Sequence, residues 1–291
     1  MEQQKFILMT DSASDLSAGL VEQYDLAVIP LQMTINGKTY NNYPDEREIK
    51  NRDFYKMLRE GGRPTTSAVN VGDFHHFMEG YLAQGLDILY LGFSSALSST
   101  VEAAKIAAAE LCEKFPGRTV RVIDTLCASL GEGMLVYLAA KKRQEGAGLE
   151  EVAEFAEGMK LSICHWFTVD DLFFLKRGGR VSAATALLGS ALGIKPILHV
   201  DNLGRLINVS KMRGRKKSIE EIARHMKEGV RPEYAKLAFI VHGDCMEDAK
   251  ALEAILRQNG VEEIYINFNG PVIGAHSGPG TLSVFYVGYE R

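Results

Sequence analysis

Hydroxyl side chains are concentrated in three short segments of the chain. Thr10–Asp15 and Ser94–Thr100 each follow a strand-like apolar run, and Pro64–Ser67 precedes a helical pattern. Hydroxyls and free backbone N–H groups at the start of a helix can bind an anion. One such segment can serve only to cap a helix, but Ser94–Thr100 has five hydroxyl residues in seven positions, more than a cap requires. The three segments together predict an anion site built from neutral donors.

A fourth segment, Gly270–Gly280, combines a histidine with glycines and prolines that would stiffen a loop and expose its backbone. A lone histidine is often only a structural group, but this setting makes His276 a candidate ligand contact. The other six histidines lack the spacing of metal ligands, so we expect no metal site.

Several nucleotide and catalytic motifs are absent from the sequence. It has no phosphate-binding P-loop, no GxGxxG fingerprint and no GxSxG nucleophile elbow. An anion site is therefore expected without a site for ATP or a dinucleotide, and no cofactor is expected. Two basic runs, Lys176–Arg180 and Lys211–Lys217, stand out in a chain of net charge -4. Each alone is commonly a solvated face, but together they favour a patch directed at an anionic ligand or an acidic partner.

Bulk properties narrow the class of protein further. The net charge of -4 argues against a surface built throughout for nucleic acid. Four cysteines without a CxxC pair fit a reducing compartment. The apolar run at the N-terminus is too short for a signal peptide, and the run 183–194 is too short to span a bilayer. We expect a cytoplasmic chain without a membrane span; a transient contact with a membrane surface is left open.

The order of apolar runs predicts an α/β fold with two domains. In residues 1–160, strands such as 87–93 and 118–125 are each followed by a helical pattern, which indicates a mostly parallel sheet flanked by helices. In residues 161–291, hairpins mixed with helices indicate an α+β domain. Ligands of such parallel sheets bind beyond the carboxyl ends of the strands, where the hydroxyl segments lie.

These segments resemble the DegV family, whose members are similar to the fatty-acid-binding B subunits of bacterial fatty-acid kinases. The most specific matches are KRGGRVS at 176–182, GIKPIL at 193–198 and GAHSGPG at 274–280, joined by TDSASDL, PTTS and SSALSST. The likeness runs through nearly the whole chain. Two departures are the residues 68–70, where the family usually has Gln-Pro-Ser, and Ser99, where it usually has Gly.

The resemblance implies a carrier that is not catalytic on its own. It implies a long-chain fatty acid in an apolar tunnel, with the run 183–194 as a candidate wall, and a carboxylate held by Thr66, Ser95 and His276. Supporting positions in the same segments are Ser67, Ser94, Ser98, Gly274 and Gly278. A separate ATP-binding kinase subunit would then form the acyl phosphate for phospholipid metabolism. In the basic runs, we assign docking of that subunit to Arg180, Arg213 and Arg215.

Two other functions remain as alternatives. The chain could be an autonomous enzyme in which His276 acts with Ser95 or Ser277 on a small oxygenated substrate. It could also be a regulatory or nucleic-acid-binding module that uses the run 211–217, although it lacks a recognisable motif for that role.

Overall fold

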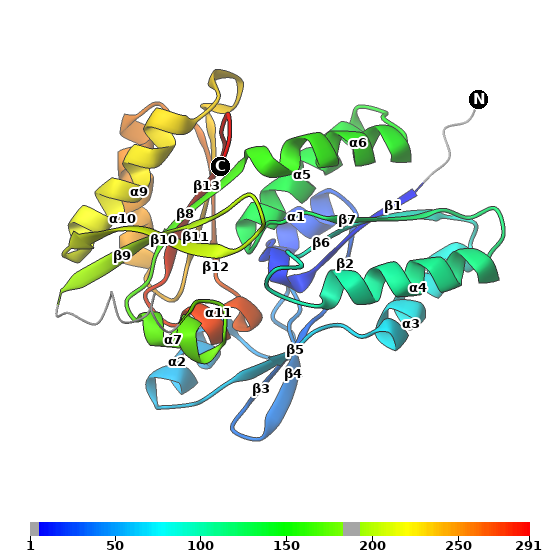
Figure 1. Ribbon diagram of the computed structural model, residues 1–291, viewed down its shortest axis with the longest axis horizontal. Helices are drawn as coiled ribbons and strands as arrows, with labels where there is room; N and C mark the ends of the chain where they lie inside the picture. The colour runs from blue at the N-terminus through cyan, green and yellow to red at the C-terminus, as the bar shows by residue number, and fades with distance from the viewer. Residues whose placement is uncertain (1–5, 183–192) are drawn as a thin grey trace.

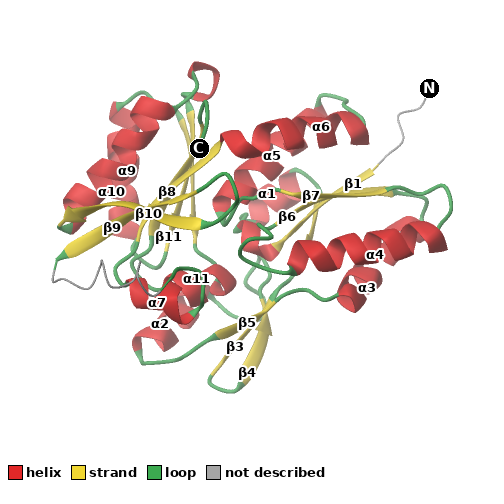
Figure 2. Ribbon diagram, in the orientation of Figure 1, coloured by secondary structure: helices red, strands yellow, loops and turns green. Residues whose placement is uncertain are grey.

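Three sheets organise the chain, which the computed structural model describes for residues 6–182 and 193–291 (Figures 1 and 2). Sheet A is parallel, in the order β2 (Leu26–Ile29), β1 (Phe6–Asp11), β6 (Asp87–Gly92) and β7 (Val120–Asp124). Sheet B is antiparallel, in the order β4 (Lys38–Asn41), β3 (Gln32–Ile35) and β5 (Thr65–Ser67). Sheet C has the order β10 (Leu206–Arg213), β9 (Ile194–Val200), β8 (Ile163–Thr168), β13 (Leu282–Val287), β11 (Leu237–His242) and β12 (Glu263–Phe268). Its strands pair antiparallel except for the β11–β12 pair.

Helices cover the sheets in layers (Figure 2). One face of sheet A packs on α3 (Val71–Ala83) and α4 (Thr100–Lys114), and its other face on α1 (Ala18–Gln23), α5 (Leu130–Gln144) and α6 (Leu149–Met159). Sheet C carries α9 (Arg215–Gly229) and α10 (Met246–Gln258) on the side away from sheet A. Of three short helices, α11 (Pro271–Ser277) contacts β3 and β5 of sheet B, and α2 (Asn51–Arg59) and α7 (Leu172–Arg177) contact α11. Three single turns are η1 (Ser12–Ser14), η2 (Lys160–Ser162) and η3 (Pro232–Tyr234).

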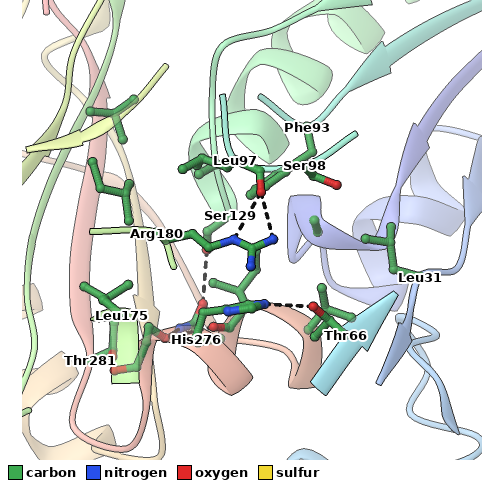
Figure 3. A pocket seen from close by; sticks show the side chains of 18 of the residues that line it. Leu31, Thr66, Phe93, Leu97, Ser98, Ser129, Leu175, Arg180, His276 and Thr281 are labelled. Carbon is green, nitrogen blue, oxygen red and sulfur yellow. Dashed lines mark hydrogen bonds between the residues drawn. The ribbon is translucent and has the colours of Figure 1, made fainter. Parts of the chain in front are cut away.

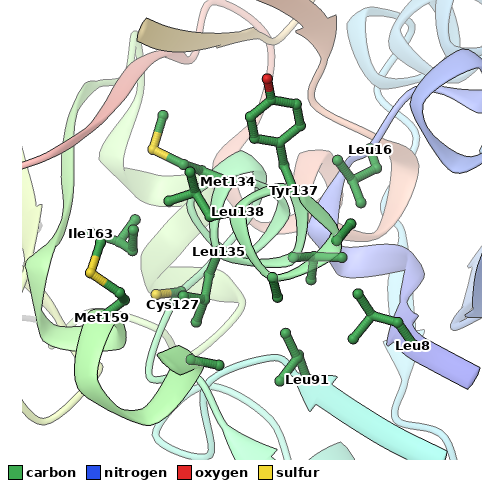
Figure 4. Packing of buried hydrophobic residues seen from close by; sticks show 14 of the residues in the cluster. Leu8, Leu16, Leu91, Cys127, Met134, Leu135, Tyr137, Leu138, Met159 and Ile163 are labelled. Carbon is green, nitrogen blue, oxygen red and sulfur yellow. The ribbon is translucent and has the colours of Figure 1, made fainter. Parts of the chain in front are cut away.

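Helix α5 joins the two larger sheets into one core (Figure 4). Its residues 130–140 are all buried, as expected for a helix that is apolar around most of its circumference. It packs on Leu8 and Leu91 of sheet A and on Phe239 of sheet C. Small residues permit this position, because a Cβ at Gly131 would lie 2.1 Å from Nε2 of His165 on β8.

The observed architecture confirms the predicted fold class. Helix α4 and strand β6 lie where the periodicity placed them, and the sheet of the first half is parallel. Two predicted loops were wrong. Residues 64–67 contain β5 at the edge of sheet B, and residues 270–280 contain α11. The signals for α11 were present, since Pro271 is its first residue and Gly278, just past its end, has a φ of 78°.

The predicted division at residue 160 coincides with a change of sheet. Sheets A and B take their strands from residues before 160, and sheet C takes its strands from residues after it. The division into two folding units stays a prediction, because one apolar cluster runs through both. The proposed tunnel wall at 183–194 lies almost wholly outside the described residues. Within the described part of the chain, no helix is both long and apolar enough to cross a bilayer.

Candidate functional site

A cavity of about 290 Å³ lies where the carboxyl end of sheet A meets one face of sheet C (Figure 3). Sheet C supplies a floor of apolar side chains, namely Phe167, Val200, Leu206 and Phe285. Leu31, Phe93 and Leu97, which lie outside sheet C, also line the cavity. The cavity occupies the place expected for a ligand of a parallel sheet, beyond the carboxyl ends of β1 and β6.

The polar side of the cavity, which we call the mouth, contains Thr66, Ser98, Arg180 and His276. Thr66 comes from β5, and His276 from the last turn of α11, 210 residues further along the chain. Thr66 Oγ1 and His276 Nε2 lie 2.8 Å apart and share a hydrogen bond. The structure therefore brings together two of the three residues expected to hold a carboxylate.

His276 is a neutral imidazole in the physiological pH range. Burial, and next the charge of Arg180, lower its pKa to about 4. Its Nδ1 is buried without a hydrogen-bond partner among the described residues. Gly178 packs directly against this ring, since a Cβ there would lie 2.1 Å from Nδ1. The glycine of the KRGGR run therefore makes room for the histidine.

Arg180 reaches across the mouth from the end of α7 to the hydroxyl-rich loop. Its Nε and Nη2 donate to the carbonyl oxygen of Leu97 at 3.1 and 2.9 Å, and its Nη1 donates to the carbonyl of Gly178. It is the one lysine or arginine among the described residues that line the cavity. Arg180 was expected to dock a partner, whereas the structure places it beside the imidazole of His276.

The loop 93–100 turns other side chains toward the cavity than expected. Ser98 and Ser99 line it. Ser95 is exposed and does not line it, and its N–H donates to Asp124 Oδ1 at 3.2 Å. Ser94 is fully buried, and its hydroxyl donates to the carbonyl of Gly204 at 2.9 Å. The structure therefore does not bring Ser95 to Thr66 and His276.

The supporting residues have distinct positions. Ser67 lines the cavity. Gly274 and Gly278 let α11 pack closely, because a Cβ would lie 2.6 Å from the Tyr55 hydroxyl oxygen at Gly274 and 2.6 Å from the Phe174 ring at Gly278.

The other two predicted docking arginines differ from each other. Arg213 is exposed at the end of β10. Arg215 is largely buried and pairs with Asp248 at 2.9 Å and with Asp170 at 3.6 Å. Its charge is therefore already compensated within the chain.

Sequence analysis missed several polar residues of the cavity. Ser129, Asn269 and Ser283 line it and are buried. His165 also lines it, but both of its ring nitrogens are paired, with Ala128 N at 3.1 Å and with Ile163 O at 2.9 Å. Ser129 could have been found by the rule used for the other loops, because it follows the strand β7 of the same parallel sheet.

The described residues contain no group of three or more histidine, cysteine, aspartate or glutamate side chains that could hold a metal ion. The chemistry of the mouth is that of neutral hydrogen-bond donors beside one guanidinium. Such a set suits an anion that must stay reactive, because hydroxyl and imidazole groups bind it without a direct ion pair.

Comparison with known proteins gives consistent relatives along the whole chain. Residues 5–288 match the model described as "Uncharacterised protein, DegV family". A DegV domain-containing protein of Clostridium perfringens is 42% identical over 98% of each chain. A structure of a DegV family protein from Thermus thermophilus, for which fatty-acid binding is described, has a TM-score of 0.85 at 35% identity and covers 98% of this chain and 100% of its own.

A structure of DegV from Bacillus subtilis, described as a fatty acid binding protein, has a TM-score of 0.84 at 30% identity. It covers 98% of this chain and 99% of its own. The family model, the curated relative and these structures span nearly all of both chains. This chain belongs to the DegV family.

Proposed function

We propose that this protein binds one long-chain fatty acid in the cavity and holds the carboxylate at the mouth. The observation that carries the proposal is the make-up of the cavity, which combines apolar side chains from sheet C with the donors Thr66, Ser98 and His276. The fatty-acid binding described for the relatives from Thermus thermophilus and Bacillus subtilis supports the same ligand class.

The tail and the carboxylate of the fatty acid would contribute differently to the binding free energy. Burying a tail of about sixteen carbons yields on the order of 12 kcal/mol before the costs of association. The mouth therefore need not add much affinity. Its task is to satisfy a carboxylate that would otherwise be costly to remove from water.

Thr66 and His276 provide a direct way to bind that carboxylate. When His276 Nε2 carries its proton, it donates to Thr66 Oγ1, and the Thr66 hydroxyl is free to donate to the ligand. Ser98 also lines the cavity, and Arg180 offsets the negative charge from nearby. The expected contribution of Ser95 passes in this proposal to Ser98, which shares its loop.

We further propose that a separate ATP-binding kinase subunit phosphorylates the carboxylate to an acyl phosphate. The chain has no P-loop, and a carboxylate at the mouth would be accessible to another protein. Arg213 is the best candidate for docking among the three arginines, because it is exposed and has no ion pair among the described residues. An exposed charge of this kind acts mainly on the association rate and its salt dependence.

An autonomous enzyme that uses His276 and a loop serine on a small oxygenated substrate is the weaker alternative. A catalytic histidine is commonly oriented by an acidic side chain. His276 instead pairs with Thr66, and the described residues place no carboxylate on its Nδ1.

Mass spectrometry of the denatured protein, purified from a heterologous host, tests the ligand. We expect close to one fatty acid per chain. The proposal fails if organic extraction yields no acyl chain and the protein also takes up no added palmitate or oleate.

The kinase step has its own test. The loaded protein is mixed with ATP and a purified ATP-binding fatty-acid kinase subunit, and acyl phosphate is measured at rising ionic strength. We expect the rate to fall with salt and with Arg213→Ala. Lys105→Ala serves as a control, because this exposed cation is on α4, on the other side of the fold from β10 (Figure 1). Equal rates for Arg213→Ala and wild type would remove this arginine from docking.

A further inference from the structure

The segment Asp11–Asp15 was expected to be part of an anion site, but Asp11, Ser12 and Asp15 do not point into the cavity. Asp11, Ser12 and Asp15 are all buried, at 0%, 4% and 6% exposure, and none of the three lines the cavity. Two of the three are carboxylates, which would repel an anion. Each of the three side chains instead accepts a hydrogen bond from a different segment that forms the cavity.

We propose that Asp11, Ser12 and Asp15 form a positioning hub for the mouth, and that Asp15 fixes the helix that carries His276. This inference rests on the proposed function, because it assigns residues that would align the carboxylate-binding groups without touching the ligand.

The first arm of the hub holds the hydroxyl-rich loop. Asp11 Oδ2 accepts from the backbone N–H of Phe93 at 3.1 Å and from the hydroxyl of Tyr90 at 2.7 Å. Asp11 Oδ1 accepts from Ala13 N at 2.9 Å. Phe93 lines the cavity and leads directly into Ser94–Thr100. Asp11 therefore determines where this loop leaves sheet A.

The second arm holds sheet B. Ser12 Oγ accepts from the backbone N–H of Leu31 at 2.9 Å. Leu31 lines the cavity and immediately precedes β3, in which Met33 pairs with Thr66 of β5. The position of the Thr66 hydroxyl is thus tied to the same segment.

The third arm holds α11 at its start. Asp15 Oδ1 accepts from the N–H of Gly270 at 2.9 Å, and the Asp15 carbonyl accepts from Asn267 Nδ2 at 2.7 Å. Gly270 is the N-cap of α11. A larger residue there would displace this carboxylate, since a Cβ at Gly270 would lie 2.7 Å from Asp15 Oδ1. Asp15 itself has a φ of 51°, in the left-handed region.

The same carboxylate also reaches the far end of α11 through a chain of side chains. Ser129 Oγ donates to Asp15 Oδ2 at 2.6 Å and lies 3.3 Å from Asn269 Oδ1. Asn269 Nδ2 donates in turn to Ser277 Oγ at 2.6 Å, one residue beyond His276. Ser129 has a φ of 54° and a ψ of -144°, a strained backbone that this network holds in place.

The carboxyl group of Asp15 changes between its ionised and protonated forms within the physiological pH range. Burial, and to a smaller extent the charge of Asp11 on β1, raises the pKa of Asp15 to about 7, against the hydrogen bonds from Ser129 and Gly270. The other ionisable groups that interact with it are Glu132 on α5 and Tyr55 on α2. Once Asp15 is protonated, one of its oxygens becomes a donor, and the Ser129 hydroxyl can turn to its second acceptor.

The experiment follows His276 by NMR in the full chain with ¹⁵N-labelled histidine, first without added ligand. His276 itself stays neutral above its pKa of about 4. In the wild type we expect its ¹⁵N signals to shift with a midpoint near pH 7, reporting Asp15, and in Asp15→Asn we expect this midpoint to vanish. Ser129→Ala should move the midpoint while the carboxyl group remains, which covers the case in which Asp15→Asn does not fold.

The matched control is Asp87→Asn. Asp87 is as buried as Asp15, and its carboxylate accepts a hydrogen bond from Thr119 N at 2.8 Å. It lies at the start of β6, at the end of the strands of sheet A away from the cavity. The Asp87→Asn variant should retain the midpoint near pH 7 in the His276 signals. A midpoint that persists in Asp15→Asn, or that vanishes as well in Asp87→Asn, would overturn the hub.

A second measurement uses palmitate labelled with ¹³C at the carboxyl carbon. Asp15→Asn should shift or broaden the bound carboxyl signal, whereas palmitate affinity should fall by less than about tenfold because the tail stays buried. An unchanged carboxyl signal would contradict the hub. If wild-type protein binds no palmitate, the proposed function fails, and the histidine signals still decide on the hub.

Discussion

The floor and the mouth of the cavity differ in how they would act on a ligand. The floor presents Phe167, Val200, Leu206 and Phe285, which offer only apolar contact. The mouth presents Thr66, His276 and Arg180, which are linked to one another or to the backbone by hydrogen bonds. Apolar contact is non-directional and grows with buried area, whereas a hydrogen bond depends on geometry. The difference teaches that affinity and headgroup chemistry can be changed separately in this protein.

The largest loss of palmitate affinity should come from a bulky substitution on the floor of the cavity. Leu206→Trp should lower palmitate affinity by roughly sixtyfold or more, because displacing about three methylenes forfeits about 2.4 kcal/mol. Titration calorimetry or displacement of a fluorescent fatty acid measures this loss. Ile207→Trp is a matched control, because this neighbour on β10 is 38% exposed and points to the other face of the strand. Equal losses in both variants would show that the floor does not hold the tail.

Arg180 should give the next largest effect. Arg180→Met removes the charge and the bonds to Leu97, and we expect palmitate affinity to fall about tenfold, because the buried carboxylate loses the nearby charge that offsets its own. The pKa of His276 should also rise above about 4, because Arg180 lowers it. Histidine NMR measures that rise.

Arg180→Lys separates the effect of the charge at residue 180 from the effect of its hydrogen-bond geometry. Lysine keeps the charge but cannot donate to the carbonyls of Leu97 and Gly178 as a planar fork. The pKa of His276 should stay low in this variant. A pKa that rises equally in both variants would mean that geometry, and not charge, controls the imidazole.

Thr66→Ala should weaken palmitate binding less than it slows acyl-phosphate formation. Thr66→Ala removes one neutral hydrogen bond, worth roughly 0.5–1.5 kcal/mol, so palmitate should bind only a few-fold more weakly. Acyl-phosphate formation with the kinase subunit should fall further, since the carboxylate loses a fixed orientation. Thr66→Ser should restore both; a serine variant as weak as alanine would remove the hydroxyl from the site.

Arg213→Ala should have no measurable effect on palmitate affinity. The residue is exposed at the end of β10 and is not part of the cavity lining. Calorimetry side by side with wild type checks this expectation. Loss of the lipid in this variant would assign the arginine to ligand binding and break the separation between affinity and docking.

Local patterns in the sequence determined the elements and the family. The alternation of apolar runs placed α4 at 100–114, and it predicted the parallel sheet, because helical and extended periodicity depend only on near neighbours. The motifs PTTS and GAHSGPG selected Thr66 and His276, which the fold does bring to 2.8 Å. The cap signals of α11 were also readable, although the segment was interpreted as a loop.

Only the tertiary structure decided which side chains of each loop face the cavity. Ser95 turns outward while its N–H bonds Asp124, and Ser94 turns toward Gly204, 110 residues away. Asp11 and Asp15 turn inward because Phe93 and Gly270 supply their donors. These partners are distant in the chain, so no local pattern specifies them; a loop side chain takes the direction in which its hydrogen bonds are satisfied after the sheets have packed.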